Sequence, residues 1–292
     1  MKKCSIDTIV LFVLFAYSGL AVASNIPLRP PVMQFNATMI DGAKPDNERV
    51  NSDSELSVRE IHAQATFAKV DLSFGKLVFG MNYKLNQYEF NNIDAKDRNL
   101  HAFDIPISLI IPRDDWLYVG RITPGIHSDF EKMGRDDYVG MGLFQATYKR
   151  SNSVSWVMGL GFDRSFGDTQ AFPIGGLRYT PNSQWLVNLV FPQLSVNYGP
   201  SARYFFFWSA QPSGGKWNIE LKSLDRALNV TTKAFRTSVG SQIKLGTKIW
   251  LKLEAGVEFG RTIEVVTNNG ITTEQDLENA GFATLGFAYH MD

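Results

Sequence analysis

Residues 283–291, near the C-terminal end, alternate between two kinds of side chain with a period of two. One face carries Ala283, Leu285, Phe287, Tyr289 and Met291, and the other carries Thr284, Gly286, Ala288 and His290. Successive residues of a β-strand point to opposite faces, so the segment is expected to be a strand with one apolar face. Such a strand suits a wall between hydrocarbon and water, and it also suits the last strand of a soluble β-protein.

The same strand carries an ordered pattern of polar, glycine, aromatic and apolar residues. Thr284, Gly286, Tyr289 and Met291 follow the order polar-x-Gly-x-x-aromatic-x-apolar. This order resembles the C-terminal signal by which bacterial outer-membrane β-barrels are recognised for assembly, with Met291 in place of a final Phe and with Asp292 after it. The resemblance implies two partners, the barrel-assembly machinery and outer-membrane lipid.

The N-terminal residues have the order of an export signal. Lys2 and Lys3 precede the apolar run 9–15, and Ala21-Val22-Ala23 forms an A-x-A cleavage site. We therefore expect cleavage between Ala23 and Ser24, with a signal peptide over 1–23 and a single domain over 24–292. The apolar run is short for a membrane anchor, which favours cleavage. The single cysteine, Cys4, would be lost, so the mature chain would hold no disulfide or cysteine-based metal site.

Strand-like alternation recurs along the rest of the chain. It is clearest in 76–86, 103–111, 154–162 and 249–259, and no comparable run shows helical spacing. The mean hydropathy of −0.13 would by itself indicate a soluble protein, but transmembrane barrels also give such values because their apolar residues alternate with polar ones. The net charge of +0 gives no general argument for a nucleic-acid partner.

Short and long connections alternate between the predicted strands, as they do in outer-membrane barrels. Short ones are expected at 73–75, 112–114, 151–153, 181–183, 212–215 and 246–247, and long ones at 41–56, 91–99, 128–136, 224–231 and 267–279. The pattern predicts an all-β fold, a single antiparallel up-and-down transmembrane barrel of 12–14 strands. The count depends on Gly199-Pro200, which is either a kink within one strand over 194–210 or a hairpin turn.

The faces of these strands predict which side chains line the lumen. If the apolar faces contact lipid, the lumen receives residues of both charges, namely Glu60, His62, Lys84, Asp104, Arg236, Lys252, Glu254 and Glu258. Buried charges must pair or contact water. The lining is therefore either a structural network that fills the lumen or the wall of an aqueous pore, and a barrel of this size permits both.

Residues 204–208, Tyr-Phe-Phe-Phe-Trp, are apolar on both faces. The inner face of this strand would either pack against a plug or loop, or line an apolar ligand path.

The sequence contains only weak matches to catalytic motifs. The four histidines lack metal-ligand spacing, so no metal or cofactor is expected. The adjacent His127, Ser128 and Asp129 would point to opposite faces of a strand, and Asp136 and Asp137 are ordinary for a solvated loop.

A further group of segments resembles a family of uncharacterised outer-membrane β-barrels, a domain of unknown function. These segments are 172–185 (FPIGGLRYTPNSQW), Phe191-Pro192, 195–198, 250–259 and the C-terminal strand. The resemblance implies a porin-like fold in the outer membrane of a Gram-negative bacterium, without an established activity or site residues.

Three functions remain to be distinguished. The leading one is a passive, porin-like channel for small solutes, or a structural barrel, without enzymatic activity. The second is a barrel enzyme that acts on lipid or peptide, and the third is a soluble periplasmic β-barrel that binds a ligand. An apolar outer belt around the whole wall would exclude the third function.

Overall fold

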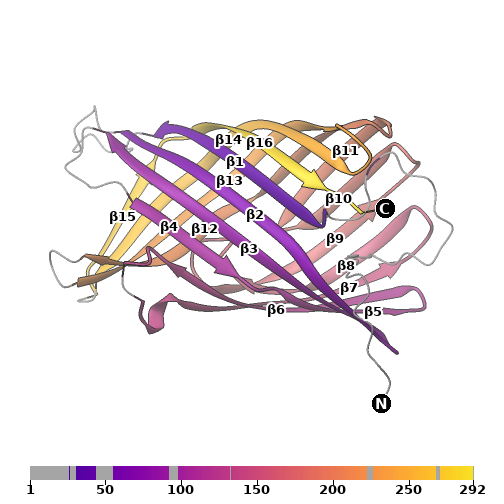
Figure 1. Ribbon diagram of the computed structural model, residues 1–292, viewed down its shortest axis with the longest axis horizontal. Coiled ribbons are helices and arrows are strands. Elements are labelled where there is room, and N and C mark those ends of the chain that lie inside the picture. Colours follow the sequence, from indigo (N-terminus) through magenta and orange to yellow (C-terminus); the bar gives the residue numbers. More distant parts are fainter. Residues whose placement is uncertain are drawn as a thin grey trace, which may run out of the picture.

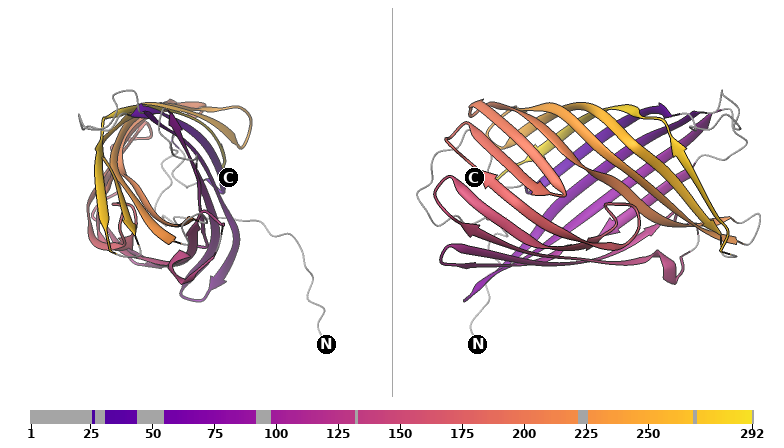
Figure 2. Two further views of the ribbon diagram at one scale, coloured as in Figure 1. Left: turned by 90° about the vertical axis from the view of Figure 1, so that its left-hand side faces the viewer. Right: turned by 180° about the vertical axis from the view of Figure 1, so that it is seen from behind.

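The computed structural model describes residue 26 and residues 31–43, 55–91, 98–131, 133–221, 226–267 and 270–291. Over these residues the chain forms a closed antiparallel β-barrel (Figure 1), and Figure 2 shows the ring of strands from one end. The predicted signal peptide and its cleavage site at Ala23 and Ser24 lie outside the described residues. No helix in the described part of the chain could cross a membrane.

The described residues form sixteen strands, which build the wall, and one short 3-10 helix, η1 (Arg135–Asp137). The strands are β1 (Met33–Ala43), β2 (Glu55–Leu72), β3 (Gly75–Asn91), β4 (Arg98–Asp104), β5 (Ile107–Arg113), β6 (Trp116–Ser128), β7 (Tyr138–Lys149), β8 (Val154–Asp163), β9 (Gln170–Tyr179), β10 (Trp185–Phe191), β11 (Gln193–Ser201), β12 (Tyr204–Leu221), β13 (Arg226–Lys244), β14 (Ile249–Thr267), β15 (Thr272–Leu277) and β16 (Ala280–Tyr289).

These strands occupy fourteen positions around the barrel, at the upper end of the predicted range. β4 and β5 share one position between β3 and β6, because Ile105 and Pro106 interrupt the segment predicted as a single strand. β15 and β16 likewise share one position beside β14, so part of the predicted loop 267–279 is a strand. β16 pairs with β14 on one side and β1 on the other, and this pairing closes the barrel.

Between residues 194 and 223 the structure decides one open alternative and corrects one predicted turn. The segment 194–210 is not one kinked strand but two, β11 and β12, with a turn at Ala202 and Arg203. The residues 212–215 are not a turn, because β12 continues through them and pairs with β13 from Tyr204 to Leu221. One turn is gained and one is lost, so the strand count stays even.

The wall is uneven in height. β12, β13 and β14 have 18, 19 and 19 residues, whereas β10 and β11 have 7 and 9. The pairing of β11 with β12 ends at Ala210, and farther along β12 makes a parallel bridge to β6 between Asn218 and Ser128. Beyond the ends of the shorter strands, the edges of β12 and β6 therefore lie side by side. The barrel is narrower at this end because fewer strands form the ring there.

The loop between β8 and β9 covers the place where the barrel narrows. Arg164 donates from Nη1 to the backbone oxygen of Lys216 on the open edge of β12, at 2.7 Å. The Lys216 ammonium binds the Asp168 carboxylate at 2.9 Å. Gly214 faces the same loop, because a Cβ there would lie 2.7 Å from the nitrogen of Gly167. The loop thus satisfies a carbonyl group that β11 leaves unpaired.

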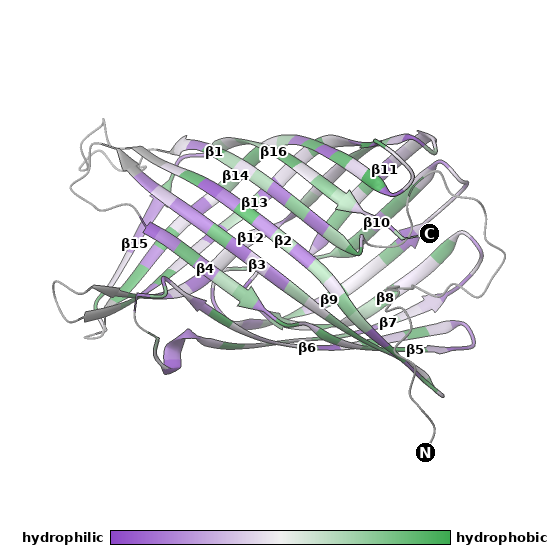
Figure 3. Cartoon of the chain, viewed as in Figure 1, coloured by the Kyte–Doolittle hydropathy of each residue, from purple (hydrophilic) through white to green (hydrophobic). Residues whose placement is uncertain are grey.

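The outer face of the wall is apolar around almost its whole circumference. Every strand position except that of β11 presents at least one exposed large apolar or aromatic side chain, among them Phe35, Phe67, Met81, Ile105, Ile122, Phe144, Leu160, Tyr179, Leu189, Phe206, Val239, Leu253 and Leu285. Figure 3 shows the resulting alternation of hydrophobic and hydrophilic bands along the strands. A soluble monomer rarely exposes apolar surface of this extent, so the face requires an apolar surrounding.

Candidate functional site in the barrel lumen

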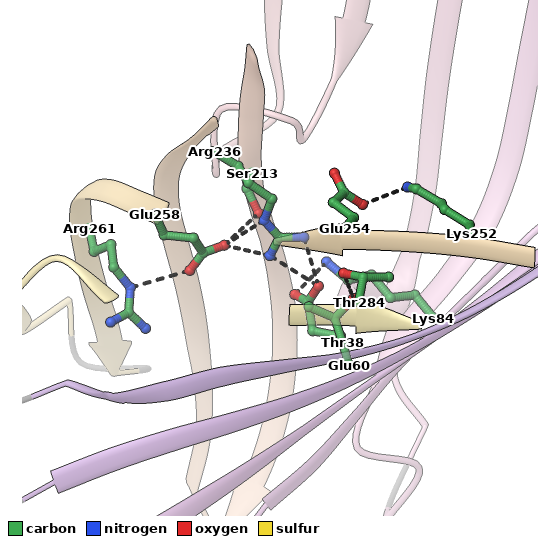
Figure 4. A network of polar contacts seen from close by, with 10 residues as sticks. All are labelled: Thr38, Glu60, Lys84, Ser213, Arg236, Lys252, Glu254, Glu258, Arg261 and Thr284. Atoms are coloured by element: carbon green, nitrogen blue, oxygen red, sulfur yellow. Dashed lines mark hydrogen bonds and ion pairs between the residues drawn. The ribbon is translucent and has the colours of Figure 1, made fainter. Parts of the chain in front are cut away.

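The centre of the lumen is occupied by Arg236, which projects inward from β13. Its guanidinium binds Glu258 on β14, with Nε 3.0 Å from Oε1, and Glu60 on β2, with Nη2 3.1 Å from Oε2. In the wall, β13 and β2 are separated by β14, β16 and β1. A contact between Arg236 and Glu60 must therefore cross the interior, as Figure 4 shows.

Other charged groups extend this contact into a layer. Lys84 on β3 binds Glu60 at 3.2 Å, and Arg261 binds the second oxygen of Glu258 at 3.3 Å. Ser213 on β12 donates to Glu258 at 3.2 Å. Each carboxylate thus has two cationic partners, so these buried charges are paired. We call Glu60, Lys84, Arg236, Glu258 and Arg261 the ionic layer.

An apolar cluster lies in the lumen on the side of the ionic layer away from the chain ends. Leu100 on β4 and Trp217 on β12 are both 2% exposed and belong to one cluster with Ile40 on β1 and Phe282 on β16. These strands come from different sides of the wall, so their side chains meet across the interior. Among the described residues, these side chains occupy part of the interior beside a small cavity of about 40 Å³, which Ile40 and Val58 help to line.

The other half, where β1 begins and β16 ends, contains a cavity of about 340 Å³. One wall is aromatic, with Phe205 and Phe207 from the run predicted to be apolar on both faces. Phe205 packs against Trp250, with ring centroids 5.7 Å apart, and against Ile26 from the N-terminal part of the chain. The inner face of this run therefore both packs against another segment and lines a cavity.

The part of the cavity wall beside these aromatic residues is polar, because Gln242 on β13 is in register with Phe205 on one side and with Lys252 on the other. It contains Gln211, Gln242 and the pair Lys252–Glu254, whose Nζ and Oε2 are 2.6 Å apart. Ser238 donates to the other oxygen of Glu254 at 2.6 Å. Gln211 faces Arg236 across the β12–β13 pair, so the ionic layer lies directly beside the cavity.

Six of the eight predicted lumen residues fall into two groups, and His62 and Asp104 lie apart from both. Glu60, Lys84, Arg236 and Glu258 lie in the ionic layer, and Lys252 and Glu254 lie at the cavity (Figure 4). His62 lies in register with Lys84 of β3 and, on its other side, with Asn36 of β1.

Asp104, the last of the eight, binds His127 rather than the ionic layer. Asp104 Oδ1 is 3.0 Å from Nε2 of His127, and Arg164 Nη1 is 3.4 Å from its Nδ1. Ser128 is fully buried and accepts a hydrogen bond from the backbone of Phe130. Both nitrogens of His127 thus have partners other than Ser128, so the triplet 127–129 lacks the hydrogen bond that would activate a serine.

The residues of the C-terminal pattern lie where β16 closes the barrel. Thr284 points inward and its hydroxyl is 2.8 Å from that of Thr38 on β1. A Cβ at Gly286 would collide with the Asn36 side chain and lie 2.9 Å from the backbone oxygen of Phe35, so glycine is required there. Tyr289 is in register with Met33 on β1 and Ile249 on β14, and Met291 follows the strand.

Sequence reasoning missed the contacts that depend on distant segments. The burial of Ile26 against Phe205 and the docking of Arg164 on Lys216 have no local pattern. Arg261 was also missed, because strict alternation along β14 would place it on the outward face, whereas the irregularity at Gly260 lets it bind Glu258. No group of three His, Cys, Asp or Glu residues in the described ranges could hold a metal ion.

Comparison with solved structures finds bacterial barrels of low sequence identity. An outer-membrane channel from Pseudomonas putida F1 is 10% identical, with a TM-score of 0.41, covering 88% of this chain and 95% of that one. The NanC porin is 9% identical, with a TM-score of 0.34 and coverage of 87% and 100%. A triple mutant of the Rhodopseudomonas blastica porin is 8% identical, with a TM-score of 0.26 and coverage of 88% and 99%.

A comparison with curated proteins gives no match. A family model, described as domain of unknown function DUF6268, matches residues 44–290, which is most of the barrel. The chain therefore belongs to the DUF6268 family.

Proposed function

We propose that this protein is an integral outer-membrane barrel and that its lumen is a narrow channel for small solutes. The observation that carries the membrane assignment is the apolar outer face, which is exposed at nearly every strand position. An outward apolar band with a polar interior is the arrangement of transmembrane barrels. A soluble ligand-binding barrel would leave this surface in contact with water at high cost.

The lumen supports a channel over a purely structural barrel. A structural barrel would be filled by side chains from end to end, whereas here a cavity of about 340 Å³ with a partly polar wall remains in one half. The ionic layer and the apolar cluster beyond it form the barrier to passage. The conformation described is therefore the closed state of this channel, and the ionic layer is the part that must rearrange to open it.

The first test concerns the location. The mature protein is expected in the outer-membrane fraction, with an electrophoretic mobility that changes on boiling because a closed barrel resists detergent at room temperature. Recovery as a soluble periplasmic protein would contradict the membrane assignment.

The second test concerns conduction in planar lipid bilayers. Wild-type protein should give small conductance, and Arg236→Ala should give larger steps, because the substitution removes the guanidinium from the centre of the lumen. The carboxylates keep a partner in this variant, since Lys84 still pairs with Glu60 and Arg261 with Glu258. The matched control is Arg203→Ala in the exposed turn between β11 and β12. Equal conductance of both variants and the wild type would exclude the ionic layer as the barrier.

A further inference from the structure

The cavity beside the ionic layer has the features of a ligand site. Its volume of about 340 Å³ falls within the rough range of 300–1,000 Å³ found for small-molecule pockets. Phe205 and Phe207 form an apolar part of the wall, with their rings inclined at 53° to each other, and Gln211 and Gln242 stand among the polar lining residues. A ligand that fits both must itself have one apolar face and a polar rim.

The charged groups of the lining are already satisfied. Lys252 binds Glu254 at 2.6 Å, and its ammonium also lies 5.4 Å from the ring centre of Phe207. Ser238 donates to the remaining oxygen of Glu254. The pair has no net charge, and an ionic ligand would have to break it. The lining therefore favours a neutral ligand.

The two glutamines supply the capacity for hydrogen bonding. Both side chains are half-buried, and neither makes a hydrogen bond with any other described residue. Each amide offers donors and an acceptor, so each matches a group that both donates and accepts, such as a hydroxyl. Gln242 is in register with Phe205, six residues from Gln211 and thus about 20 Å along the strands, so a ligand that contacts both must be elongated. A purely apolar ligand would remove these amides from water without replacing their hydrogen bonds.

We infer that this cavity binds a neutral disaccharide, an inference that rests on the proposed solute channel. The apolar face of a sugar ring stacks on Phe207, and hydroxyl groups of the disaccharide bond to Gln211 and Gln242. The aromatic wall, the free amides and the internally paired charges each meet one requirement of this ligand class. The site lies beside the ionic layer, where a bound solute contacts the barrier to passage.

The test is titration calorimetry on the folded barrel in an amine-oxide detergent, because glucoside and maltoside detergents themselves carry sugars. Glucose, maltose, lactose and sucrose are compared with gluconate as an anionic probe and cyclohexanol as a weakly polar one. At least one of the neutral disaccharides should bind saturably, and gluconate and cyclohexanol should not. Gln211→Leu and Gln242→Leu should each weaken sugar binding by up to about tenfold.

A matched control is Gln87→Leu, which removes an amide bonded to Asn99 on the neighbouring β4. It should leave the affinity unchanged, and Phe207→Leu should lower it. Each variant is first checked for heat-modifiable mobility, so that a folding defect is not mistaken for lost binding. The inference fails if no neutral disaccharide binds a correctly folded wild-type barrel, or if the two glutamine variants bind as the wild type does.

The outcomes separate this inference from the proposed function. A barrel that conducts in bilayers but binds no sugar would retain the channel and lose the sugar site. A barrel that binds sugar but never conducts would retain the site and lose the channel. Binding of gluconate or cyclohexanol in place of sugars would assign the cavity to another ligand class.

Discussion

At the residue scale, the orientation of a side chain was predictable from the sequence and its partner was not. Alternation along 249–259 places Leu253 outward and Lys252 and Glu254 inward, and the structure has the same faces. The period of two is a local property of an extended backbone. The contact of Arg236 with Glu60 joins residues 176 positions apart, so it depends on how the whole wall closes.

The two faces of β14 give a prediction for neighbouring residues. Leu253→Arg places a charge in the middle of the apolar belt and should destabilise the barrel by about 2–4 kcal/mol. Glu254→Gln, one residue away, should be tolerated far better because it faces the polar cavity. Unfolding of both variants in urea, in lipid vesicles, measures the difference. Similar destabilisation by the two changes would show that the faces are assigned wrongly.

At the element scale, strands were predictable but two turn signals were misleading. Gly199-Pro200 lies within β11, and the actual turn follows at Ala202 and Arg203. The glycines and proline of 212–215 indicate a turn by composition, but β12 passes through them without a break. Gly214 is small because the β8–β9 loop lies against it. A small residue needed for such a close approach cannot be told from a turn residue in the sequence.

The closing strand gives a prediction about assembly. Deleting residues 289–292 removes the pairing of Tyr289 with Met33 and Ile249, and the hydrogen bond from the His290 nitrogen to the Lys248 oxygen at 2.9 Å. We expect the truncated protein to remain unassembled in the periplasm. Fractionation with the boiling assay measures this outcome, with Asp292→Asn as the control. Normal insertion of the truncated chain would show that these residues are no assembly signal.

The β8–β9 loop gives a prediction about pH. The hydrogen bond from Lys216 lowers the pKa of Asp168 below its ordinary value. A carboxyl with a lowered pKa holds the loop at neutral pH and loses this contribution as the pH falls through the lowered value. We therefore expect Asp168→Asn to reduce the hydrogen-exchange protection of the loop at neutral pH, and much less at acid pH. Asp115→Asn, in an exposed turn, should not change it. An equal effect at both pH values would contradict this account.

At the scale of the whole molecule, the closed antiparallel barrel was predictable and the contents of its lumen were not. The alternating faces and the two classes of connection determine a barrel with an apolar exterior. The shape of the interior also depends on differences in length between the strands, because long strands can meet past the ends of short ones. β12 reaches β6 only because β10 and β11 are short, and that difference appears in no motif.

The pairing of β1 with β16 has a consequence for circular permutation. The Val32 nitrogen donates to the Tyr289 oxygen at 2.8 Å, so a short linker could join the two ends of the barrel wall. New ends could be opened at the exposed turn between β5 and β6. The permuted chain would contain the same wall, but its last strand would be β5. If it refolds in detergent yet is not inserted by cells, the order of the strands matters to biosynthesis and not to the fold.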